Sequence, residues 1–265
     1  MRFRDEQMRI LLTNDDGIHA RGLFALYRRF SMKHEVFIVA PDRQRSAVGH
    51  SITLHKPIRC ERIQLEGNVF GYALNGTPAD CIKLAILELM DIKPDLVLSG
   101  INPGANIGFN VNYSGTVCAA REAGFYGIPA IAVSMPGDGT RYIDDAAAFV
   151  EQVAQRVLEH PICQGTVLNI NIPDIPIDKI AGVRITRLET YPIEEHFERR
   201  TDPRNREYYW QGCEQQRAFS GPDTDGAALS RNYITLTPIR CDITNYDILE
   251  KLKGWQLEPR GFDGK

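Results

Sequence analysis

Short apolar runs alternate with segments of helical spacing along the first half of the chain. The runs predict buried strands at RILLT (9–13), EVFIVAP (35–41), DLVLSG (95–100) and PAIAVS (129–134). Between them, apolar residues at helical spacing predict helices near 21–30, over 78–90 and from about 114. Strands that alternate with helices favour an α/β fold, with a mainly parallel sheet covered by helices on both faces.

Three further segments extend this pattern. Two β-rich runs within 57–74, PIRCERIQL and NVFGYAL, are separated by EGN and predict an inserted hairpin. Residues 143–159 place apolar side chains near the helical period, with Asp144 and Asp145 in the first turn, which predicts a long helix. TVLNINIP (166–173) predicts another buried strand.

The pattern changes over 188–232, where charged and aromatic residues mix without a long apolar run. The flanks of TDPRN predict an exposed hairpin arm with Pro203 in its turn. A partner subunit is the favoured surface for the arm's aromatic side chains, and packing back onto the same chain is the alternative. We therefore divide the chain into a core over 1–187, a protruding β arm over 188–232, and a C-terminal strand and helix over 233–265 that return to the core or to a partner subunit.

Composition narrows the function classes. A net charge of -3 over 265 residues gives no basic surface field, so binding to a nucleic acid polymer is not expected, whereas one small phosphorylated ligand fits. The six cysteines form no CxxC pair, which favours reduced thiols and a cytoplasmic protein over a disulfide framework or zinc site. No apolar window approaches the roughly 18 residues of a membrane span, and the charged start MRFRDEQMRI is unlike a secretory leader, so no membrane association is expected.

Side chains with oxygen or guanidinium groups lie at or just after the ends of three of the predicted strands. They are Asn14, Asp15 and Asp16 at the first, Asp42, Arg43, Arg45 and Ser46 at the second, and Ser99, Asn102 and Asn106 at the third, whose apolar run ends at residue 98. In a doubly wound sheet, ligands bind outside the carboxyl ends of the strands, so these residues can converge. A carboxylate pair with hydroxyl and amide oxygens suits Mg²⁺, Mn²⁺ or Ca²⁺ rather than zinc. The alternative is that Asn14 and Asp15 only cap the next helix.

A second site element is NYSGTVCAAREAG (112–124), in which Ser114, Gly115 and Thr116 lie at a helix start. Free N–H groups at a helix start bind anions, and phosphate is an anion that also ligates a hard metal. An ordinary Ser cap is the alternative for this segment. Because neither GxGxxG nor GxxxxGKS/T occurs at a strand-to-helix turn, dinucleotide oxidoreductases and P-loop NTPases are not favoured.

Five motifs occur in an order and spacing that closely resemble the SurE family of survival-protein 5'-nucleotidases. They are RILLTNDDGIHARGL, VAPDRQRSAVGHSITL, NGTPADCI, VLSGINPGANIG and NYSGTVCAAREAG. The resemblance covers residues 8–135, and LNINIPD and YITLTPI extend it towards the C-terminus. It implies a three-layer αβα Rossmann-like sandwich with protruding C-terminal β-hairpin elements that mediate a homodimer or homotetramer.

The resemblance also implies metal-dependent hydrolysis of nucleoside 5'-monophosphates, with 3'-monophosphates and polyphosphate as further substrates. It implies one divalent ion per subunit, Mg²⁺ or Mn²⁺, in a site that Ca²⁺ can also occupy. The family's metal ligands fall on Asp15, Asp16, Ser46 and Asn102. The candidate phosphate contacts are Asn106, Ser114, Gly115 and Thr116.

Asp15 is the candidate catalytic residue, and we expect it to position or deprotonate a water that attacks phosphorus directly. An aspartyl-phosphate intermediate on Asp15 is the competing route. Two other functions stay open: a non-catalytic nucleotide sensor that uses the same pocket, and a general small-molecule phosphatase. No motif in the sequence reads a base, so the base preference and the choice between 5' and 3' phosphate stay open as well.

Overall fold

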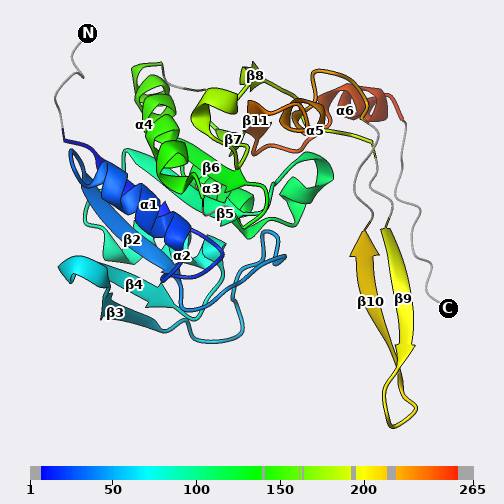
Figure 1. Ribbon diagram of the computed structural model, residues 1–265, viewed down its shortest axis with the longest axis horizontal. Coiled ribbons are helices and arrows are strands. Elements are labelled where there is room, and N and C mark those ends of the chain that lie inside the picture. Colours follow the sequence, from blue (N-terminus) through cyan, green and yellow to red (C-terminus); the bar gives the residue numbers. More distant parts are fainter. Residues whose placement is uncertain are drawn as a thin grey trace.

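The centre of the protein is one sheet with helices on both faces (Figure 1). The computed structural model describes residues 7–138, 141–160, 162, 164–191, 195–213 and 219–255, and within them this sheet has nine strands. From edge to edge they are β3 (Cys60–Gln64), β4 (Phe70–Leu74), β2 (Glu35–Pro41), β1 (Arg9–Thr13), β5 (Leu96–Pro103), β6 (Ala130–Met135), β7 (Thr166–Asn171), β11 (Tyr233–Arg240) and β8 (Gly182–Ile185).

Most neighbouring strands are parallel, as the alternation of strands and helices predicts. The exceptions among the described strands of this sheet are the antiparallel pairs β3 with β4 and β7 with β11. The chain places β2 on one side of β1 and β5 on the other, so the strand order reverses at β1. The carboxyl ends of β1 and β5 therefore border the switch point at which open α/β sheets bind ligands.

Alternate residues of the buried strands belong to two separate cores. In β1, Ile10 and Leu12 pack into one core, whereas Leu11 between them packs into the other. The first core is covered by α1 (Arg21–Phe30) and α4 (Ile143–Glu159), and the second by α2 (Pro78–Leu84) and α3 (Gly115–Phe125). Because strand side chains alternate between faces, an apolar β1 needs a helix layer on each side. The expected three-layer fold is confirmed.

The elements predicted for the core form close to their predicted positions. The helix predicted over 78–90 is α2 followed by a π-helical turn over Ala85–Leu89, and its start is closed by a capping box between Thr77 and Asp80. Two short elements, β8 and α5 (Asp225–Leu229), are not predicted by the pattern. Elements of this length show too few repeats of either period to be recognised from sequence.

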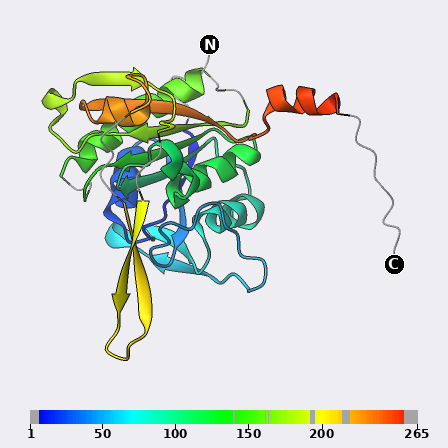
Figure 2. The same cartoon turned by 90° about the vertical axis from the view of Figure 1, so that its right-hand side faces the viewer.

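The hairpin of β9 (Glu195–Thr201) and β10 (Glu207–Cys213) projects from the body of the protein (Figures 1 and 2). β11 lies inside the sheet, whereas α6 (Tyr246–Lys253) stands apart from it and buries no residue against the described chain (Figure 2). The division at 187 and 232 stays a prediction, and the range assigned to the arm also contains α5, which packs against β11. Residues 192–194, 214–218 and 256–265 of these ranges lie outside the described chain.

Candidate active site

Asp15 lies at the start of helix α3. It follows β1 by two residues and is only 4% exposed. The Thr116 hydroxyl donates a hydrogen bond to Asp15 Oδ1. A Cβ atom added to Gly115 would lie 2.7 Å from Asp15 Cβ, so only glycine allows this approach of helix and aspartate. The structure thus places this carboxylate at the positive end of α3.

The turn that follows β1 is closed by Asn14 rather than by a helix cap. Asn14 Nδ2 donates to Gly17 O at 3.0 Å, and Gly17 N donates to Asn14 Oδ1 at 3.2 Å. The N-cap of α1 is Ala20, which makes no side-chain cap. The alternative in which Asn14 and Asp15 only cap the next helix is therefore wrong: these side chains bond to the turn and to α3.

Asp15 and Asp16 form a carboxylate pair whose surroundings disfavour the charged form of both side chains. Burial and the neighbouring charge of Asp15 raise the pKa of Asp16 to about 7. Burial also raises the pKa of Asp15, against the lowering effect of hydrogen bonds from Thr116 and nearby backbone N–H groups. Asp16 Oδ2 is buried and has no hydrogen-bond partner among the described residues. A buried, unpaired carboxylate oxygen beside a second carboxylate fits a site for a hard divalent cation.

The loop carrying Ser46 is tied to Asp15 through the backbone. Arg45 N donates to Asp15 O at 2.6 Å. The exposed Ser46 hydroxyl accepts a hydrogen bond from Gln44 Nε2 at 2.9 Å. The described contacts bring the Ser46 segment beside Asp15 but include none between the Ser46 side chain and either carboxylate.

Asn102 lies at the carboxyl end of β5, next to β1. The pairing of β5 with β6 shifts register between Ser99 and Asn102, which is the kind of irregularity that re-aims side chains near binding sites. Asn102 Nδ2 donates to Gly104 O at 2.7 Å, so its amide oxygen keeps its acceptor role. Nowhere in the described chain do three His, Cys, Asp or Glu side chains gather as a metal site. A cation bound here would depend on the aspartates together with neutral oxygens.

Asn106 is held by a buried group of polar side chains that the sequence pattern did not reveal. Asn106 N donates to Asn171 Oδ1 at 2.8 Å, and Asn106 O accepts from Asn171 Nδ2 at 3.0 Å and from Asn169 Nδ2 at 2.8 Å. Asn106 Nδ2 donates to Ser134 Oγ at 2.8 Å. An amide nitrogen carries two hydrogens, so the second one stays available to a ligand. We call Asn169, Asn171 and Ser134 the Asn106 clamp.

The signal for this clamp is present in LNINI, where asparagines occupy alternate positions of an apolar strand. The apolar pattern of this run predicts a buried strand and gives Asn169 and Asn171 no role. Both are fully buried, and buried amides need hydrogen-bond partners. Two amides on one face of a buried strand could therefore have indicated a polar loop packed against them.

The three candidate phosphate contacts on α3 differ in what their side chains do. Ser114 Oγ accepts the Val117 N–H at 3.1 Å, so the alternative of a Ser cap is present in the structure. A hydroxyl that accepts in this way still has its proton to donate to a ligand. The Thr116 hydroxyl instead donates to Asp15, which gives Thr116 a positioning role. The backbone N–H groups of Gly115 and Thr116 lie beside the Asp15 carboxylate and lower its pKa, so an anion at this helix start would share them with Asp15.

Comparison with known proteins identifies the family. The sequence model of the family described as Survival protein SurE matches residues 10–195. This chain belongs to the SurE family. The matched range contains Asp15, Asp16, Asn102 and the Asn106 clamp, whereas α5, β11 and α6 follow it.

Individual SurE relatives match almost the whole chain. The protein named 5'-nucleotidase SurE of Desulfatibacillum aliphaticivorans is 53% identical over 252 residues, which is 95% of this chain and 99% of that protein. The protein of the same name from Carboxydothermus hydrogenoformans is 50% identical over 254 residues, covering 94% of this chain and 96% of that protein. The crystal structure of the SurE protein from Aquifex aeolicus superposes with a TM-score of 0.80 at 36% identity, covering 92% of this chain and 98% of that one.

Proposed function

We propose that this protein is a divalent-metal-dependent phosphomonoesterase that hydrolyses nucleoside 5'-monophosphates to nucleoside and phosphate. The observation that carries the proposal is the contact between Asp15 and the first turn of α3. It joins a carboxylate pair suited to a hard cation with backbone donors suited to phosphate. Near full-length relatives named 5'-nucleotidase SurE support the same activity.

Asp15, Asp16, Ser46 and Asn102 are the residues that would hold the cation, Mg²⁺ or Mn²⁺ in our proposal. When bound, such a cation supplies charge stabilisation and polarises a phosphoryl oxygen. The first turn of α3 and the free hydrogen of Asn106 Nδ2 would bind the remaining phosphoryl oxygens. These donors are fixed in advance, because the Asn106 clamp and the Ser114 cap hold their backbones.

Asp15 would orient the attacking water and accept its proton. Thr116 donates to Oδ1 of this carboxylate, so Oδ2 is the oxygen that we assign to the water. The same oxygen could instead attack phosphorus, displace the nucleoside and form an aspartyl-phosphate, which water would then cleave to phosphate and free Asp15.

The configuration at phosphorus distinguishes these two routes. We expect inversion during hydrolysis of a substrate made chiral at phosphorus with oxygen isotopes and sulfur, because direct attack is one in-line displacement. Retention would show two displacements and favour the covalent route. The measurement needs only the wild-type protein and one nucleotide analogue.

Phosphate release tests the proposed activity. The panel is nucleoside 5'- and 3'-monophosphates, ribose 5-phosphate, p-nitrophenyl phosphate and short polyphosphate, each with Mg²⁺, Mn²⁺, Ca²⁺ or a chelator. We expect nucleoside 5'-monophosphates to be the best substrates and the chelator to abolish release. Asp15→Asn should lower kcat/KM by about 100- to 10,000-fold, the usual contribution of a general base. Asn102→Ala should raise the metal concentration required for half-maximal rate.

Asp91→Asn is the matched control, because Asp91 is an exposed aspartate that precedes β5. It therefore lies towards the amino ends of the strands, whereas the site lies at their carboxyl ends. It should leave every rate unchanged. Equal rates for all phosphomonoesters would indicate a general phosphatase. Nucleotide binding without phosphate release under every metal would refute the enzyme and favour the nucleotide sensor.

We also propose a homodimer or homotetramer in the cytoplasm. The assembly is supported by exposed aromatic residues on the hairpin arm and by the apolar side chains of α6. Cys60, Cys81, Cys118 and Cys241 are free thiols, which fits a reducing compartment. No helix in the described part of the chain is long and apolar enough to cross a membrane.

A further inference from the structure

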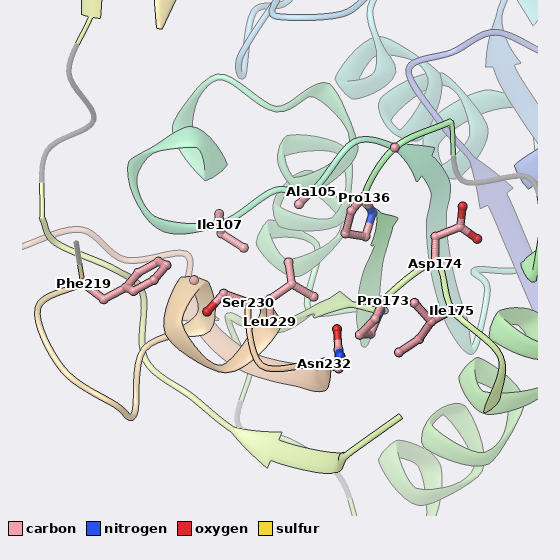
Figure 3. A pocket seen from close by; sticks show the side chains of 12 residues that line it. Ala105, Ile107, Pro136, Pro173, Asp174, Ile175, Phe219, Leu229, Ser230 and Asn232 are labelled. Carbon is pink, nitrogen blue, oxygen red and sulfur yellow. The ribbon is translucent and has the colours of Figure 1, made fainter. Parts of the chain in front are cut away.

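A cavity of about 540 Å³ opens at the carboxyl ends of β5, β6 and β7 (Figure 3). One wall is made by residues that directly follow these strands: Ala105, Ile107, Pro136, Gly137, Pro173, Asp174 and Ile175. The other wall is made by α5 and its flanks: Phe219, Gly226, Leu229, Ser230 and Asn232. Its volume lies within the range of small-molecule sites, and its position is where α/β sheets bind ligands.

The cavity adjoins the proposed phosphate site. Asn106 lies between two wall residues, Ala105 and Ile107, so its clamped backbone is shared by the cavity and the site. Neighbouring strands lie about 4.8 Å apart, which puts the end of β6 about 10 Å from the end of β1. A nucleoside monophosphate covers this span from its phosphorus to the far edge of its base.

The walls offer an aromatic ring, aliphatic surface and a few polar groups. The Phe219 ring packs over Gly226, where an added Cβ would lie 2.8 Å from the ring and 3.5 Å from Ile107 Cδ1. Figure 3 shows Ile107 and Pro136 on one side of the cavity and Leu229 and Asn232 on the other. Ser230 Oγ donates to Ala227 O at 2.9 Å and keeps its acceptor role. Such a mixture suits a flat heterocycle with a polar edge.

We propose that this cavity binds the base of the nucleoside monophosphate, with Phe219 as the stacking residue and Asn232 as a polar contact to the base edge. The inference rests on the proposed function. It makes α5 and its flanks the part of the protein that selects nucleotides over other phosphomonoesters. The cavity lies away from the reacting phosphorus, so its contacts are equal in the ground state and the transition state. They therefore affect KM rather than kcat.

Two variants test this role with little risk to the fold. Asn232 has a positive φ of 63°, so Asn232→Gly removes the amide and keeps a backbone that glycine adopts freely. Phe219→Leu keeps an apolar side chain over Gly226 and removes the aromatic face. Met32→Ala is the control, because Met32 is 75% exposed in the α1–β2 connection. This connection lies at the amino ends of the strands, whereas the cavity lies at the carboxyl ends. Thermal unfolding of each variant checks that the fold is intact.

The measurement is kcat/KM for adenosine 5'-monophosphate relative to ribose 5-phosphate, which lacks the base. We expect Phe219→Leu to lower this ratio about tenfold through a higher KM for the nucleotide, since aromatic stacking contributes that much per base. Asn232→Gly should lower the ratio less, and both variants should leave ribose 5-phosphate hydrolysis unchanged. Met32→Ala should leave the ratio at its wild-type value.

Three results would overturn the inference. An unchanged ratio in both variants would show that the base binds elsewhere. Loss of a larger oligomer in both variants, with the ratio unchanged, would assign the cavity to a segment of a second copy. Failure of the wild-type protein to release phosphate from either substrate would instead refute the proposed function, and the inference with it.

Discussion

Asn171 is the residue that best tests how the candidate site is held in place. Its side chain bonds both the N–H and the carbonyl of Asn106, which are buried. Asn171→Ala should lower kcat/KM by roughly 10- to 100-fold, since small displacements of a ligand contact have effects of this size. It should also lower the free energy of unfolding by about 1–3 kcal/mol, the cost of a buried polar group left unpaired. Phosphate release and urea unfolding measure the two effects.

Thr235→Val is the matched control for Asn171. Thr235 pairs with Asn171 across β11 and β7, is fully buried, and its hydroxyl has no hydrogen-bond partner in the described chain. Replacing this hydroxyl by a methyl group should leave activity intact and stability equal or higher. A loss of activity in Thr235→Val equal to that in Asn171→Ala would contradict a specific role for the clamp, because any change in this part of the strand would then suffice.

These residues also show what the sequence could and could not predict. Asp15 and Asp16 stand out because adjacent carboxylates after a buried strand repel each other unless a cation or a proton neutralises them. Asn171 was missed because its role depends on a contact with Asn106, 65 residues away. Thr116 was expected at the phosphate, but its rotamer is set by Asp15, which is 101 residues away. Spacing along the chain identifies which residues can share a site, whereas hydrogen-bond partners depend on tertiary packing.

Helix α5 is held against the rest of the protein by two buried acids, Asp225 and Glu189. Asp225 accepts from Gly108 N at 3.0 Å and from Glu189 N at 2.8 Å, which links α5 to the segment after Asn106. Glu189 in turn accepts from Thr224 Oγ1 at 2.7 Å and from Ser220 N at 3.0 Å. No periodicity predicts such an element, since five residues held by side-chain hydrogen bonds leave no apolar repeat.

Glu189 should make the stability of the protein depend on pH. Burial opposes its ionisation, but hydrogen bonds from Ser220, Tyr191 and Thr224 outweigh burial and lower its pKa from 4.5 to about 2. A carboxyl whose pKa is lower in the folded state stabilises the fold above its unfolded pKa, and this contribution is lost as the pH falls from 4.5 to about 2. The difference corresponds to about 3 kcal/mol at neutral pH.

Urea unfolding of the wild type and Glu189→Gln at several pH values measures this contribution. The variant should be less stable than the wild type near pH 7, and the two should approach each other as the pH falls towards the folded pKa of about 2. The reason is that glutamine, like protonated glutamate, lacks the charge that these donors stabilise. A stability difference that stays constant with pH would contradict this account and leave only a packing effect.

Two apolar surfaces of the protein, on the hairpin arm and on α6, have no partner within the described chain. Every residue of β9 is exposed, and the aromatic side chains Phe197, Tyr208, Tyr209 and Trp210 of the arm are between 40% and 66% exposed. An isolated two-stranded hairpin is marginally stable in water, so an arm of this kind is expected to be held by an interface. α6 carries a second apolar surface on a different side of the protein (Figure 2).

Two separate surfaces on one chain favour a homotetramer built from dimers over a simple homodimer. Trp210→Ser should reduce the assembly to a smaller species, because Trp210 is 60% exposed at the middle of the arm and large aromatics dominate interface energies. Phe70→Ser is the control, because Phe70 is an exposed aromatic residue in β4, near the β3 edge of the main sheet. It should leave the mass of the assembly unchanged. Sedimentation velocity at micromolar concentration measures both. A wild-type protein that sediments as a 29.9 kDa monomer would contradict the assembly. It would favour the alternative in which the aromatic residues of the arm pack onto their own chain.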